Sequence, residues 1–177
     1  MLRYFYAFLL VFCFFTSNVH AASIEEINRF EKLITEGDVI ECTAHFSQTE
    51  NNEIYQLNLL GIMKVTYSGE SEKRYHSTQY YRLNGSKIPF IRYEMDIIAT
   101  HEKSKLKEEI VPDSVQVFYP SAPEQEAILA EAVRKTAPMS IDYDDITFTT
   151  FPDYQVKVKS PSMPEAMTQY CQVQTKK

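Results

Sequence analysis

Ionisable side chains alternate with uncharged ones along two stretches that flank the pair Asn84-Gly85. Asn-Gly is the preferred pair for a tight hairpin turn, so we expect the two stretches to pair as antiparallel strands. A register with one bulged residue sets opposite charges across from each other, with Arg74 facing Asp96 and His76 facing Glu94. The sequence therefore predicts a polar strip on one face of a sheet.

The predicted strip could act as a recognition surface, because arginine and tyrosine are enriched at the centres of protein interfaces. Its alternative is an ordinary solvated face whose ion pairs contribute little. His76 beside Glu94 could in principle be a general base with its orienting acid, although no nucleophile is placed next to them. The residues of the predicted binding strip are Arg74, His76, Tyr80, Arg92, Glu94 and Asp96.

The first 21 residues have the order of a cleavable signal peptide, with Arg3, then an uncharged and mainly apolar run, then Val19-His20-Ala21. The run is too short to span a membrane. We therefore expect an exported protein, periplasmic or secreted, that keeps no stable membrane span after cleavage. Residues 22–177 are expected to form a single domain.

Loss of the leader removes Cys13 and leaves Cys42 and Cys171. Two cysteines in an oxidising compartment predict one disulfide, which would close a loop of about 130 residues. In the chain-entropy account such a loop stabilises the fold by about 4 to 5 kcal/mol, less any strain. A metal site or a catalytic thiol is the weaker interpretation, because no paired histidine or CxxC accompanies the cysteines.

The periodicity of apolar residues predicts an α+β fold: a twisted antiparallel sheet of about six strands with three helices. The first helix begins at a capping box, Ser23 with Glu26. A mid-chain helix is expected after Ser121-Ala122-Pro123-Glu124. A short C-terminal helix is expected from Pro164 to about Val173. Between them, alternating apolar and polar positions are typical of strands with one buried face.

The remaining motifs favour no enzyme class. Asp142-Tyr143-Asp144-Asp145 lacks the spacing of a calcium loop and is better explained as a turn before a strand. His101 to Glu109 is interpreted as a charged hairpin tip. There is no G-x-S-x-G, P-loop or dinucleotide motif, so we expect no cofactor and no metal.

The net charge of −6 argues against nucleic-acid binding, which needs a basic surface. The leading hypothesis is a small exported binding protein without catalysis, such as an inhibitor, immunity-type or envelope accessory protein, with a protein partner. One alternative is a small envelope hydrolase that uses His76 and Glu94. The other is a ligand carrier whose sheet curls around an apolar cavity lined by Leu57, Leu59, Tyr93 or Met95.

Overall fold

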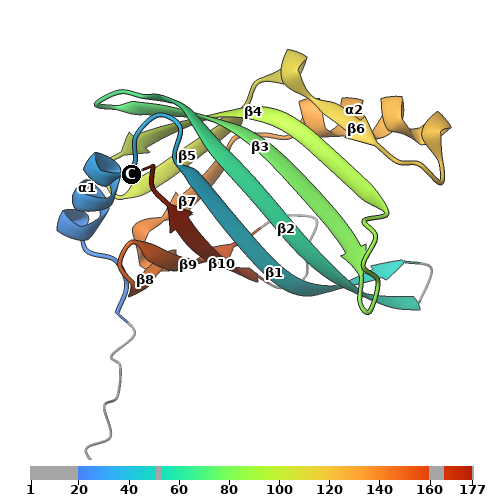
Figure 1. Ribbon diagram of the computed structural model, residues 1–177, viewed down its shortest axis with the longest axis horizontal. Helices are drawn as coiled ribbons and strands as arrows, with labels where there is room; N and C mark the ends of the chain where they lie inside the picture. Colours follow the sequence, from blue (N-terminus) through green and yellow to red (C-terminus); the bar gives the residue numbers. More distant parts are fainter. Residues whose placement is uncertain (1–19, 51–52, 160–165, 177) are drawn as a thin grey trace, which may run out of the picture.

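A computed structural model of the chain describes residues 20–50, 53–159 and 166–176. In this part of the chain, ten strands form one antiparallel sheet, accompanied by two short α-helices (Figure 1). The helices are α1 (Ile24–Leu33) and α2 (Glu126–Arg134). The strands are β1 (Val39–Glu50), β2 (Glu53–Ser68), β3 (Glu72–Leu83), β4 (Ile91–Glu102), β5 (Lys105–Ile110), β6 (Gln116–Phe118), β7 (Met139–Asp142), β8 (Ile146–Thr150), β9 (Asp153–Val158) and β10 (Met167–Gln174).

The sheet curls until it is nearly closed, in the manner of a barrel. Its strand order is β7-β5-β4-β3-β2-β1-β10-β9-β8, with β6 paired to β4 beside this path. The two outermost strands, β7 and β8, are joined by a single 3₁₀ turn, Tyr143–Asp145. A three-residue connection holds the two edges of the sheet close together, because each residue spans at most about 3.6 Å.

Alternation along the strands decides what faces the interior. On β4, Met95, Ile97 and Ala99 are buried whereas the intervening residues are more exposed. On β5, Leu106 and Ile110 belong to the same interior. Side chains of a strand point alternately to the two faces of the sheet, so one face is apolar and buried and the other faces solvent.

Helix α1 closes one end of the curled sheet (Figure 1). The predicted capping box is confirmed: Ser23 Oγ accepts from the Glu26 N–H, and the Glu26 carboxylate accepts from the Ser23 N–H. Phe30 packs against Phe148 and Tyr154, with ring centroids 5.5 and 5.3 Å away. The apolar stripe of α1 is thereby buried against β8 and β9.

A buried lysine joins the end of α1 to the sheet. Lys73 on β3 is 3% exposed, and its ammonium donates to the main-chain oxygens of Glu31 and Ile34 at 2.8 Å and to Ser68 Oγ at 2.6 Å. The Glu31 carboxylate lies 3.5 Å from the same ammonium. The last carbonyls of a helix lack partners within the helix, so a cation there is stabilising.

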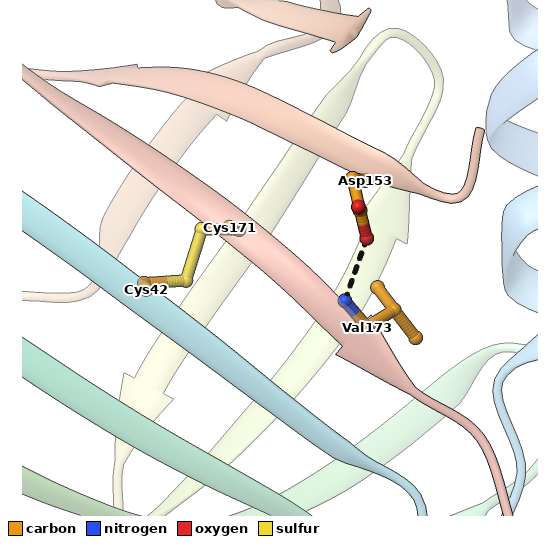
Figure 2. Close-up of a disulfide and its surroundings, with 4 residues drawn as sticks. All are labelled: Cys42, Asp153, Cys171 and Val173. Atoms are coloured by element: carbon orange, nitrogen blue, oxygen red, sulfur yellow. Dashed lines mark hydrogen bonds between the residues drawn. A yellow bond between two sulfur atoms is a disulfide. The ribbon is translucent and has the colours of Figure 1, made fainter. Parts of the chain in front are cut away.

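The predicted disulfide is confirmed. Cys42 and Cys171 lie directly opposite each other on β1 and β10 and are joined across 129 positions of sequence (Figure 2). Near the end of the same strand, Asp153 accepts a hydrogen bond of 2.9 Å from the Val173 N–H (Figure 2). Both interactions hold β10 in place. Because β10 pairs with β1, the first and last strands of the fold lie side by side.

The predicted fold class was wrong: the protein is mainly a curled antiparallel sheet of ten strands, not a six-stranded sheet with three helices. From Met167 on, the segment predicted as a C-terminal helix belongs to β10, in which Met167 and Cys171 are buried on the same face. Residues 164 and 165 of that prediction lie outside the described residues. Pairing with β1 and β9 on both sides outweighs the local helix propensity. The strand count was low because the hairpin tip and its surroundings were treated as loop, whereas Lys105–Ile110 forms β5.

The mid-chain helix exists but begins later than predicted. Pro123–Gln125 is a 3₁₀ turn, Ala122 provides no side-chain cap, and α2 starts at Glu126. Instead of a capping box, the Glu126 carboxylate accepts a 2.6 Å hydrogen bond from the Tyr119 N–H. This bond anchors the start of α2 to the segment that follows β6.

The proposed leader, residues 1–21, lies almost entirely outside the described residues, so its role stays a prediction. Among the residues described, no helix combines the length and the apolar character that crossing a bilayer requires.

Candidate functional site

The predicted polar strip lies on the outer face of β3 and β4, and its register differs from the predicted one by two residues. His76 pairs with Asp96, Thr78 with Glu94 and Tyr80 with Arg92. The turn at Asn84-Gly85 is present, but it belongs to a seven-residue connection, 84–90, rather than joining the strands directly. Because a shift of two preserves the side of the sheet, all six strip residues still share one face.

The strip contains two local ion pairs. His76 Nδ1 lies 2.8 Å from Asp96, and Arg92 Nε lies 3.2 Å from the Glu94 carboxylate. Arg74 is not brought to Asp96; it pairs with Glu72 at 2.7 Å.

His76 and Asp96 are each about half exposed, at 49% and 50%. Because His76 faces Asp96, the predicted facing pair of His76 with Glu94 was wrong. The acidic and basic side chains of the strip therefore pair with each other or, for Arg74, with Glu72, and are partly exposed to solvent.

The opposite face of the same strands encloses a cavity of about 960 Å³. Small-molecule sites in proteins commonly have volumes of about 300 to 1,000 Å³. Leu57 and Leu59 of β2 line it, as do Tyr93 and Met95 of β4. These are the four residues that the carrier hypothesis named.

The cavity continues around the curled sheet. Val158 of β9 and Met167 of β10 line it opposite β4, and Ile110 and Met139 line it from β5 and β7. Helix α2 contributes Leu129. Most of the surface that a bound molecule would meet is therefore aliphatic or aromatic.

On the side away from α1, β2, β3 and β4 extend beyond the shorter strands (Figure 1). Tyr55 and Leu83 line the cavity and are also exposed at 36% and 44%. Ile54 and Ile88, in the neighbouring hairpin and connection, are exposed at 69% and 77%. Exposed apolar side chains therefore lie at this end of the sheet, and two of them, Tyr55 and Leu83, also line the cavity.

Amides, hydroxyls and phenols also line the cavity, among them Ser121, Gln125 and Thr136 around α2. Gln79 and Gln169 contribute amides, and Tyr81 and Tyr93 contribute phenols. Burial raises the pKa of Tyr81 to about 12 and also raises the pKa of Tyr93, so both phenols are neutral donors at physiological pH. Tyr81 donates to Gln79 at 3.2 Å.

One carboxyl, that of Glu108 on β5, lines the same cavity. Burial raises the pKa of Glu108 to about 7, because the low-polarity surroundings disfavour its charged form. The side chain still has some accessible surface, since it borders the open space of the cavity. Glu108 forms no hydrogen bond or ion pair with any other residue in the described ranges.

A second, smaller cavity of about 40 Å³ lies beneath α1 and is bordered by a polar cluster. His101 Nε2 lies 3.2 Å from the Glu31 carboxylate, and His101 Nδ1 lies 2.7 Å from the Tyr143 hydroxyl. Glu31 also pairs with Lys73. The groups of this cluster satisfy one another, and the space has room for little more than a water molecule.

The acidic cluster predicted to be a turn forms the 3₁₀ turn Tyr143–Asp145 ahead of β8. Asp142 pairs with Lys105 at 3.2 Å, and Asp145 pairs with Lys159 at 2.9 Å. Within the described ranges, no group of three or more histidine, cysteine and acidic side chains is arranged to hold a metal ion.

Sequence reasoning missed Glu108, which it placed in the charged hairpin tip. The signal that could have found it is the alternation Leu106, Glu108, Ile110, which continues the interior face of β5 while Lys107 and Glu109 point outward. An acidic residue on the interior face of a strand, between two apolar residues, is unusual because carboxylates are rarely buried without a partner.

Comparison with known proteins gives no family: no family model, curated protein or solved structure matches the chain. Function must therefore be argued from the geometry alone.

Proposed function

We propose that this protein binds a small, largely apolar molecule inside its curled sheet and carries it without chemical change. The observation that supports the proposal most directly is the 960 Å³ cavity with its aliphatic and aromatic lining. In a sheet that curls without such a ligand, side chains from facing strands normally fill the interior to crystal-like density. A large apolar space is stabilised when a ligand occupies it.

The arrangement of the two ends supports the same function. Helix α1 covers one end with Phe30 and its aromatic neighbours, whereas Tyr55 and Leu83 line the cavity and are partly exposed to solvent. An apolar molecule gains free energy at both stages, by contact with these two side chains and then by burial inside.

The polar strip does not support the hydrolase alternative, because His76 faces Asp96 instead of Glu94 and lines neither cavity. Recognition of a protein partner through the strip stays a prediction, as does export through the leader. Both are compatible with a carrier, which must collect its cargo in one place and deliver it in another.

The proposal can be tested by filling the cavity with a side chain. Gln79→Trp places an indole inside the cavity, whereas Thr78→Trp, one residue earlier, places the same group on the outer face. The measurement is the fluorescence of diphenylhexatriene, an uncharged hydrocarbon that emits strongly in apolar surroundings.

We expect the wild type and Thr78→Trp to bind the probe with a saturable signal, and Gln79→Trp to lose at least about tenfold in affinity, because its side chain occupies the space that the probe needs. Absence of saturable binding to the wild type would contradict the proposal. So would equal loss in both folded variants.

A further inference from the structure

Glu108 is the one ionisable acid or base, tyrosines aside, among the described residues that line the large cavity. Its immediate neighbours on the sheet carry no charge, since Ala99 lies opposite on β4 and Met139 opposite on β7. No lysine, arginine or histidine in the described part of the chain borders this space. The cavity therefore offers a ligand one carboxyl and no cation.

The groups that face Glu108 from more distant elements do not neutralise it. Tyr154 from β9 and Tyr75 from β3 interact with it electrostatically, and burial raises the pKa of both phenols, which keeps them uncharged. Glu31 from α1 interacts electrostatically with the same two phenols and is already paired with Lys73 and His101. A carboxylate held without a partner in apolar surroundings is strongly unfavourable.

Resting on the proposed function, we propose that the cavity is specific for lipophilic amines, molecules with an apolar body and a single protonated amino group that pairs with the Glu108 carboxylate. Charge complementarity selects this class. An ammonium supplies the missing cation, whereas a fatty acid would bring a second negative charge into a space without a compensating one. The phenol rings of Tyr81 and Tyr93, which line the same cavity, add favourable surfaces for a cation.

The same geometry makes binding depend on pH. An alkylamine stays protonated throughout the range from pH 5.5 to 8, whereas Glu108 loses its proton within that range. The affinity for an amine should therefore rise by about 30-fold between these two pH values, the ratio expected for a partner that must be ionised. The affinity for an uncharged analogue of the same length should change much less.

The experiment displaces bound diphenylhexatriene with three twelve-carbon probes that differ only in the head group: dodecylamine, dodecanol and dodecanoate. At pH 7.5 we expect dodecylamine to act at a concentration at least about tenfold below that of dodecanol, and dodecanoate to be the weakest. Glu108→Gln should abolish the preference for dodecylamine over dodecanol. Glu109→Gln, the adjacent residue on the outer side of β5, should behave as the wild type.

The outcomes separate this inference from the function on which it rests. If no hydrocarbon or alcohol binds, the carrier function itself fails. If dodecanol binds but the amine has no advantage, or if its advantage survives in Glu108→Gln, the amine specificity is wrong and the carrier function stands. Tighter binding of dodecanoate than of dodecylamine would also overturn it.

Discussion

Two partly buried carboxyls, those of Glu31 and Glu108, have different surroundings in the curled sheet. At the end closed by α1, the Glu31 carboxylate lies 3.5 Å from the Lys73 ammonium and 3.2 Å from His101. In the open cavity, Glu108 has neither a cation nor a hydrogen-bond donor among the described residues. Both side chains are partly buried, so the difference lies in the partners that the fold provides.

The contrast separates polar groups that hold the fold together from those that the fold leaves unsatisfied. The polar cluster around Glu31 joins a helix to the sheet and needs nothing from outside. Glu108 has no such partner among the described residues, and under the proposal above a bound amine supplies it. Substitutions at the two ends should therefore change stability with opposite signs.

The largest effect is expected at the closed end. Lys73→Met removes the ammonium that satisfies the carbonyls of Glu31 and Ile34 and the hydroxyl of Ser68, and it leaves the Glu31 carboxylate without this cation. Breaking a buried ion pair on one side lowers the free energy of unfolding by about 3 to 5 kcal/mol. Urea denaturation measures this loss.

Lys64→Met is the matched control for Lys73→Met, since Lys64 lies on the adjacent strand β2 and is exposed. We expect its free energy of unfolding to change by less than about 0.5 kcal/mol. Equal effects of the two substitutions would show that the closed end is not a structural cluster.

The disulfide lies between the two regions, and its loss should rank second. Cys171 is two residues beyond Gln169, which still lines the large cavity. Cys42→Ser with Cys171→Ser should lower the free energy of unfolding by about 2 to 4 kcal/mol, because the unfolded chain regains the entropy of an open loop of 129 residues. Reductant should shift the melting temperature of the wild type downward and leave the double variant unchanged. A shift of equal size in both would contradict a structural disulfide.

The sequence predictions that were correct depend on local features of the sequence. The capping box at Ser23 and the pairing of Cys42 with Cys171 depend on neighbouring residue types or on counting, and both were predicted correctly. The failures are long-range. The strand β10 has a partner on each side, and neither partner can be inferred from residues 164–173 alone.

The candidate site was predicted in part. The residues of the outer strip share one face because strand alternation fixes the side of the sheet, but the length of the connection after Leu83 sets the register and was misjudged. The lining of the cavity by Leu57 and Met95 follows from the same alternation. Glu108 was missed because the closure of the sheet, rather than any motif, turns a charged segment into a wall of the interior.

The smallest predicted change in stability is a gain, and it distinguishes the cavity from the closed end most sharply. Glu108 has a pKa of about 7 in the folded protein against 4.5 ordinarily. Between these values the folded state holds a proton that the unfolded state has lost, so stability falls as the pH rises through this range and stays lower above it. The free energy of unfolding falls by at most about 3 kcal/mol across this range, and solvent that reaches the cavity makes the loss smaller.

Glu108→Gln removes this titration and keeps the shape of the side chain. We expect the variant to be more stable than the wild type by about 1 to 3 kcal/mol at pH 8 and equally stable at pH 4.5, measured by urea denaturation at both values. Glu109→Gln, on the outer side of the same strand, should show no such dependence. A loss of stability at pH 8 would mean that Glu108 is already paired in the folded protein, because only a satisfied carboxylate contributes favourably there. The contrast with Glu31, and the need for a cationic ligand, would then disappear together.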